Sequence, residues 1–207
     1  MKFTLRDAEM LQSIFSSRRD VRGNRFQDTT IEDKVLRKIL EAAISAPSVG
    51  FSQPWKFLIV KDAAKREEMY NEFVSENAKA SKKFKDNSLY PTLKLEGIKE
   101  SPLNIAVLYQ KPIKAVLGQT TQKKMGEYSV VCAIQNLWLM ARAHNIGVGW
   151  VSILRPKKVK KILGIGEEYK LIGYLTMGYV NEFLDEPELL KLGWEEKKTL
   201  DEVVEWV

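Results

Sequence analysis

The sequence predicts a layered α+β fold in which helices cover a small central sheet, and three observations support this prediction. Short β-branched and aromatic runs of strand length alternate with longer segments of helical periodicity. Helical segments precede the first strand, unlike a dinucleotide-binding fold, which opens on a strand and a glycine-rich turn. The 207 residues, 44% of them hydrophobic, suffice for one core. We therefore expect a single domain over residues 1–207.

Two helices are expected before the first strand. In residues 7–17, apolar side chains recur at three- and four-residue spacing, as in an amphipathic helix. A second helix is expected to be capped by Thr29 or Thr30, with Glu32 placed as in a capping box, and to end at Pro47. This second helix carries a long apolar stripe, so we expect that stripe to be buried.

The rest of the chain alternates strands with helices around one long loop. The expected strands are residues 55–60, 104–110, 147–154 and 170–180, and the expected helices are residues 62–80, residues 125–144 and a short helix that begins at Pro156. Residues 81–103 have weak periodicity and contain several lysine, proline and glycine residues. We interpret them as a long loop or lid, a kind of segment that is usually functional or disordered.

Composition excludes several classes of protein. A single cysteine, Cys132, excludes an intrachain disulfide, and His144 lies too far along the chain to form a ligand pair with it, so no metal is expected. Arg6, Asp7 and Glu9 interrupt the stretch where a signal peptide needs an apolar run, and no window is apolar enough to span a membrane. The net charge of +6 suits either nucleic acid or an anionic small molecule. We therefore expect a cytoplasmic protein that acts on an anionic partner.

An arginine cluster follows the first predicted helix. Arg18, Arg19 and Arg22 place three guanidinium groups within five residues, beside the carboxylate of Asp20. Arginine binds phosphate through paired, charge-assisted hydrogen bonds, so the cluster is a candidate phosphate site. A solvated basic patch, partly neutralised by Asp20, explains the same residues, and the cluster by itself does not decide between the two.

Two further segments carry polar groups in restricted surroundings. Residues 45–55 join a helix to a strand through small residues and two prolines, so backbone can approach a flat ligand closely, with Gln53 as a donor and acceptor. Taken alone, the segment is better explained as an ordinary tight connection in which Trp55 begins the strand and packs in the core. Ser152 is one hydroxyl in an apolar predicted strand, where a serine usually bonds to backbone.

Five segments together resemble one family. They are RRDVR, APSVGFSQPW, LYPTLKLEGIKESPLNIAV, YSVVCAIQNLWLMARAHNIGVGWVSIL and PELLKLGW. In order and approximate spacing they are similar to the flavin-destructase branch of the nitroreductase superfamily, over residues 16–206. The resemblance implies a nitroreductase-like fold with a central mixed or antiparallel sheet, a homodimer, and FMN at the subunit interface. It also implies oxygen-dependent conversion of reduced FMN into 5,6-dimethylbenzimidazole, with a separate flavin reductase supplying the reduced FMN.

The same resemblance assigns roles to individual residues. Asp20 and Ser152 are the expected catalytic residues, because the chemistry requires a base and a positioned hydroxyl. Residues 84–101 correspond to a lid that would exclude water from the flavin. Lys197 stands where an arginine is expected, and a lysine keeps the charge but loses the bidentate fork. The expected FMN-binding residues are Arg18, Arg19, Asp20, Val21, Arg22, Ser48, Gln53, Lys94, Ser152 and Lys197.

Two other functions are weighed against this one. An NAD(P)H-dependent nitroreductase or a reductive dehalogenase would recycle its FMN and leave the flavin intact. A non-catalytic flavin-binding or nucleic-acid-binding protein has only the high isoelectric point, about 9.2, and the lysine-rich stretches in its favour. Asp20, Ser152 and the lid favour the flavin-consuming reaction, because a simple hydride shuttle does not need them. Neither nucleic acid nor a membrane is expected as a partner.

Overall fold

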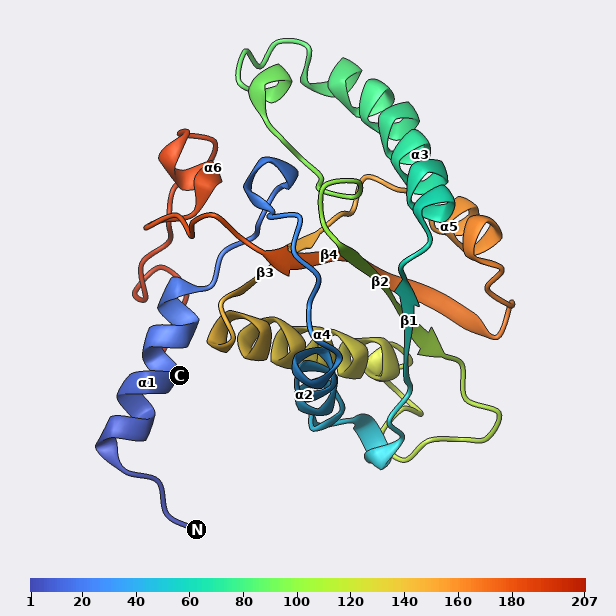
Figure 1. The fold of residues 1–207 in the computed structure, drawn as a ribbon. Helices are drawn as coiled ribbons and strands as arrows, with labels where there is room; N and C mark the ends of the chain where they lie inside the picture. The colour runs from blue at the N-terminus through green and yellow to red at the C-terminus, as the bar shows by residue number, and fades with distance from the viewer.

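The computed structural model describes residues 1–207 and has a four-stranded sheet at its centre (Figure 1). The strands are β1 (Trp55–Val60), β2 (Leu103–Gln110), β3 (Ile146–Trp150) and β4 (Tyr169–Tyr179). Their order across the sheet is β1-β2-β4-β3, and every neighbouring pair is antiparallel. The predicted α+β fold with a central sheet is therefore confirmed, and β1 and β3 form its two edges.

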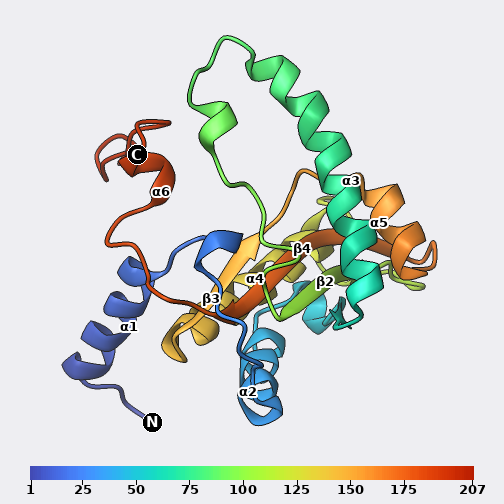
Figure 2. The same cartoon turned by 45° about the horizontal axis from the view of Figure 1, so that its top comes forward.

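Helices cover both faces of this sheet (Figures 1 and 2). One face packs against α2 (Asp33–Ile44) and α4 (Met125–Ala143), and the other packs against α3 (Ala63–Ser81) and α5 (Pro156–Leu163). Side chains alternate along a strand, so Ile105 and Val107 of β2 join the α4 side while Ala106 and Leu108 join the α3 side. Two apolar cores result, one on each side of the sheet.

The first helix has a different environment. Helix α1 (Leu5–Ser17) begins at a capping box made by Thr4 and Asp7, and none of its residues is buried. It projects from the side of the molecule in both views (Figures 1 and 2). Of the apolar stripe that predicts this helix, Ile14 is half-buried, whereas Met10, Leu11 and Phe15 remain 58%, 49% and 45% exposed. Helix α4 contacts α1, but it leaves about half of the surface of these three side chains uncovered.

The second helix starts later than the sequence predicts. Its N-cap is Glu32 rather than Thr29 or Thr30, and no side chain donates or accepts a capping hydrogen bond there. Ile31 is only 4% exposed and packs into the core on the α4 side, so the chain stays extended through this residue before the helix can begin. The expected capping box is therefore wrong.

The third strand ends four residues earlier than predicted. Trp150 is its last residue, and the Val151 N–H still donates to the Tyr174 carbonyl of β4 over 2.9 Å. The chain then leaves the sheet, because Val151 and Leu154, three residues apart, both pack in the core on the α3 and α5 side, which strand alternation does not allow. Ser152 consequently lies outside any strand and is exposed. The prediction of a hydroxyl inside a buried strand is wrong. Apolar residues stand both before and after the end of β3 at Trp150, so in the sequence they resemble one continuous strand.

The predicted loop over residues 81–103 is confirmed, with two short 3₁₀ turns at Lys82–Phe84 and Tyr90–Thr92. Helix α6 (Glu188–Lys191) follows β4 and leads to the C-terminus. None of the helices combines the length and the apolar character that crossing a membrane requires.

Candidate active site

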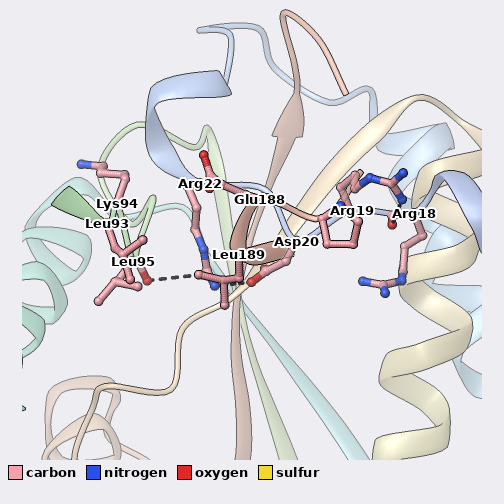
Figure 3. Close-up of a pocket in the computed structure, with 10 residues that line it drawn as sticks. Arg18, Arg19, Asp20, Arg22, Leu93, Lys94, Leu95, Glu188 and Leu189 are labelled. Carbon is pink, nitrogen blue, oxygen red and sulfur yellow. Dashed lines mark hydrogen bonds and ion pairs between the residues drawn. The ribbon is translucent and has the colours of Figure 1, made fainter. Parts of the chain in front are cut away.

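A cavity of about 170 Å³ lies where three segments distant in sequence meet (Figure 3). The first segment follows α1, the second belongs to the loop before β2, and the third lies at α6. The lining residues are Arg18, Arg19, Asp20, Arg22, Leu93, Lys94, Leu95, Pro187, Glu188 and Leu189. The cavity thus joins the predicted arginine cluster to the predicted lid.

The arginine segment is held along the free edge of β3. The backbone N–H of Val21 donates to the carbonyl of Val148 over 2.9 Å, and Asp20 forms a parallel bridge to the same residue. A Cβ atom at Gly149 would lie 2.3 Å from the Val21 carbonyl oxygen, so only glycine permits this close approach. Val21 is 2% exposed, and its side chain anchors the segment rather than facing the cavity.

Asp20 is held by two donors at the base of the cavity. Its Oδ1 accepts from the backbone N–H of Trp150 over 3.1 Å, and its Oδ2 pairs with the Arg22 guanidinium. Burial raises the pKa of the Asp20 carboxyl above its ordinary value, although the charge of Arg22 and the Trp150 hydrogen bond act in the opposite direction. The result is a positioned carboxyl group that takes up a proton more readily than an ordinary aspartate.

The three arginines have different partners. The Arg18 guanidinium stacks over the Trp138 ring, 5.1 Å from its centroid, and donates to no acceptor within the chain. The Arg19 guanidinium donates to backbone carbonyls of its own segment and of the segment before α6, including Leu184 over 2.8 Å. Arg22 also donates to the carbonyls of Leu95 and Trp150, over 3.3 and 3.4 Å. Arg18 is therefore the guanidinium with its donors available to a ligand.

The lid is bonded to the arginine segment through its backbone. Besides the Arg22 contact to Leu95, the N–H of Gly23 donates to the carbonyl of Glu96 over 2.8 Å. Lys94 lines the cavity, but its ammonium group pairs with Glu96 and Glu100 at 2.8 and 2.7 Å and points away from Asp20 (Figure 3). Burial acts to lower the pKa of Lys94, and the hydrogen bonds to the two carboxylates outweigh it and raise that pKa. The ammonium is thus already neutralised within the lid.

Ser152 and Lys197 lie outside the cavity wall. Ser152 follows Trp150 by two residues, close to the backbone group that holds Asp20, and its side chain is exposed. Lys197 is exposed in the C-terminal segment and lines no part of the cavity.

Ser48 and Gln53 are also remote from the arginine cluster. The Gln53 N–H donates to Ser48 Oγ over 3.1 Å, and Gln53 leads into β1, the sheet edge opposite β3. Three strand spacings of about 4.8 Å separate these edges, or about 14 Å. The register adds six residues of β2 between the level of Val148 and that of Trp55, about 20 Å at roughly 3.4 Å per residue. Within one chain the two groups therefore occupy diagonal corners of the sheet.

Some cavity residues had no signal in the sequence. Leu93, Leu95 and Leu189 contribute apolar wall, and Trp138 supports Arg18 from α4. These residues lie within the segments that resemble the family, but isolated leucines and a tryptophan on an apolar helix are ordinary core residues, so the sequence does not distinguish them as cavity residues. No group of three or more histidine, cysteine, aspartate or glutamate side chains is arranged to hold a metal ion.

The chain belongs to the nitroreductase family, whose model matches residues 15–179. Within the family it is similar to the 5,6-dimethylbenzimidazole synthase of Rhodospirillum rubrum, with 40% identity over 192 residues, 91% of this chain and 90% of the relative.

Solved structures show the same fold. A BluB-like flavoprotein from Clostridium difficile 630 has a TM-score of 0.71 and 18% identity, with 95% of this chain and 98% of that chain covered. An iodotyrosine deiodinase bound to FMN and 3-iodo-L-tyrosine has a TM-score of 0.70 and 22% identity, with 96% and 99% covered.

Proposed function

We propose that this protein is a 5,6-dimethylbenzimidazole synthase, an oxidoreductase that converts reduced FMN and dioxygen into the lower ligand of cobalamin. The main support for this proposal is that Asp20, the arginines and the lid meet in one cavity. The chain that forms this cavity is 40% identical to a 5,6-dimethylbenzimidazole synthase over 91% of its length. In this proposal residues 1–207 form a single FMN-binding domain. It acts in the cytoplasm, and a separate flavin reductase supplies the reduced FMN.

The cavity suits the phosphate and ribityl end of FMN. Arg18 offers unengaged guanidinium donors, and arginine binds phosphate through two parallel hydrogen bonds. The cavity volume of about 170 Å³ is below the roughly 300 Å³ at which ligand pockets usually begin. We infer that one chain holds only part of FMN, whose ring system supplies both the electrons and the carbon atoms of the product.

A second copy of the chain would complete the site. Ser48 and Gln53 lie at the sheet corner diagonal to Arg18, too far away to contact the same ring from within one chain. The half-exposed apolar residues Met10, Leu11 and Phe15 of α1 support a partner surface, because monomeric proteins rarely leave large apolar patches in water. In a two-fold dimer the same surface serves both subunits, so each site takes the arginine segment of one and the Gln53 segment of the other.

Asp20 and Ser152 are the proposed catalytic residues. The raised pKa of Asp20 and its two fixed donors suit a group that accepts a proton during the reaction. The Ser152 hydroxyl, two residues beyond Trp150, is exposed and is proposed to orient a reacting group or relay a proton. Lys94 and Lys197 are proposed as additional positive charge near the flavin, and Lys94 would have to leave its carboxylate partners to contact it.

Product analysis tests this function. FMN is reduced anaerobically with the purified protein, air is admitted, and the products are separated and identified by mass spectrometry against an enzyme-free control. We expect 5,6-dimethylbenzimidazole in an amount that matches the FMN lost. FMN that is reoxidised but intact would reject the proposal and favour a reductase that recycles its flavin, which NADH and NADPH oxidation assays would then measure.

A further inference from the structure

We propose that Arg19 is a positioning residue that clamps the C-terminal segment onto the cavity, and that the FMN phosphate is bound by Arg18 without it. This inference rests on the proposed function, because it divides the arginine cluster of that FMN site into a ligand and a clamp. Nothing in the sequence distinguishes Arg18 from the adjacent Arg19, whereas their surroundings in the structure differ.

The hydrogen bonds of Arg19 are already used within the chain. A guanidinium has five N–H donors. The Nε of Arg19 donates to the Leu184 carbonyl over 2.8 Å, and Nη2 donates to the Asp185 carbonyl. Nη1 donates to the carbonyls of Ser16 and Arg18, over 2.7 and 2.8 Å. Four of the five donors are thus engaged, so a two-pronged grip on phosphate would break at least one of these bonds.

Two other arginines hold the same segment. Arg25 pairs with Glu182 at 2.8 Å and with Glu188 at 3.2 Å. Arg142 stacks over the Phe183 ring, 4.0 Å from its centroid. Together with Arg19, they contact residues 182–185 and 188 one after another. A segment with little regular structure is therefore attached to the body of the protein mainly through guanidinium groups.

The clamped segment forms a wall of the cavity and reaches the lid. Pro187, Glu188 and Leu189 line the cavity immediately after the clamped residues. Farther on, Trp194 packs 5.6 Å from Phe84 and 6.2 Å from Tyr90, ring centroid to centroid, and these two belong to the lid region. Release of the clamp would consequently loosen one wall directly and the lid through Trp194.

Arg18 is held in the opposite manner. Its guanidinium rests on the Trp138 ring and is oriented by stacking, which leaves the N–H groups free. The Trp138 indole N–H donates to the Arg19 carbonyl over 3.1 Å and fixes the peptide group that follows Arg19. The Arg18 side chain is thus available to a ligand, whereas the Arg19 side chain is bonded to the protein.

Phosphate selectivity separates the two roles. The dissociation constants of FMN and of riboflavin, which lacks the phosphate, are measured by flavin fluorescence for Arg18→Lys, Arg19→Lys and Arg25→Lys. Arg37→Lys, at an exposed position of α2, is the matched control. Loss of the bidentate fork in Arg18→Lys should lower the preference for FMN over riboflavin by about tenfold. Arg19→Lys should weaken both ligands equally, so that this preference stays within about twofold of the wild-type value.

Hydrogen–deuterium exchange reports the clamp independently of ligand. Arg19→Lys should accelerate amide exchange within residues 184–194 and leave α4 unchanged, and Arg25→Lys should give the same local increase through its glutamate partners. The yield of 5,6-dimethylbenzimidazole per FMN oxidised should fall in both variants, because a loosened wall admits water.

The possible outcomes are distinct. If Arg19→Lys lowers the FMN preference as much as Arg18→Lys does, or leaves exchange in residues 184–194 unchanged, the clamp is refuted. If neither Arg18→Lys nor Arg19→Lys alters the preference, the phosphate site of the proposed function fails, and the exchange data alone decide the clamp. If Arg19→Lys proves too unstable to study, the same two measurements on Arg25→Lys decide it.

Discussion

The diagonal separation of Arg18 from Gln53 predicts that two inactive variants restore activity to each other when mixed. Arg18→Ala removes a guanidinium assigned to the FMN phosphate, and two charge-assisted hydrogen bonds of about 1.5–3 kcal/mol each are lost. The expected loss of at least about 3 kcal/mol weakens FMN binding by roughly 150-fold. Gln53→Gly removes the side chain expected at the ring, and glycine adopts the φ of +45° found there without strain.

Mixing these variants creates intact sites only if each site draws on two chains. After random subunit exchange, half of the dimers are hybrids, and one of the two sites in each hybrid combines an unaltered arginine segment with an unaltered Gln53 segment. About one quarter of all sites is then restored. The assay is product formation at an FMN concentration that saturates the wild type but not Arg18→Ala, with subunit exchange verified by native mass spectrometry.

A matched mixture provides the control. Arg18→Ala mixed with Arg22→Ala places both defects on the same segment, so every site in a hybrid carries one defect and no activity should return. Activity that stays at the level of the parent variants in the Arg18→Ala and Gln53→Gly mixture, despite proven exchange, would refute the two-chain site. It would then follow that a rearrangement within one chain brings Gln53 to the arginine cluster.

Three further predictions concern the carboxyl group, the sheet edge and the lid. Asp20→Asn should abolish product while FMN still binds, and the wild-type rate should fall on the acid side as pH drops through the raised pKa of Asp20, which a pH profile will test. Desolvation disfavours the ionised carboxyl, so that cost to stability exists above the raised pKa and vanishes below the ordinary value of about 3.9; because the Asp20 side chain is 36% exposed, solvent screens the cost and keeps it small. Calorimetry should therefore find Asp20→Asn slightly more heat-stable than the wild type at pH 7 and no longer so below about pH 4; a wild type that melts at the higher temperature at pH 7 would contradict this reasoning. Gly149→Ala should displace the Val21 carbonyl, weaken FMN binding and lower the free energy of unfolding in urea by about 1–3 kcal/mol. An unchanged midpoint of the urea unfolding curve would show that the segment beside β3 moves away at no cost. Trp194→Ala should separate the C-terminal segment from the lid and divert reduced FMN to hydrogen peroxide, whereas an unchanged product yield would show that the lid closes without Trp194.

Much of the fold could be predicted because local patterns and tertiary packing agree. Residues 104–110 form one apolar run, and β2 occupies Leu103–Gln110 at the centre of the sheet with helices on both sides. The apolar helix predicted over residues 125–144 is α4, which ends at Ala143 with His144 as its C-cap, just before Asn145 with its φ of +56°. In these elements periodicity reports burial directly, so the sequence contains the necessary information.

The predictions are wrong where tertiary packing places a residue differently from what its local sequence pattern indicates. Ile31 keeps the chain extended and postpones α2, although Thr29 and Glu32 form a capping pattern. Val151 and Leu154 continue the apolar run of β3, but both pack in the same core although residues three apart in a strand face opposite sides. A sequence pattern records that a residue is apolar and does not record which face of the sheet will receive it.

The sequence by itself determined the family, the alternation of strands and helices, and the segment that carries Arg18, Asp20 and Arg22. These properties depend on residue type and short spacing, which the chain carries in linear order. Only the tertiary structure decided that Arg18 stays free while Arg19 is engaged, and that Gln53 lies at the far corner of the sheet. Both depend on contacts between residues far apart in the sequence, such as Arg19 with Leu184 and Trp55 with Tyr109, and no local pattern specifies the partner of a hydrogen bond made across the fold.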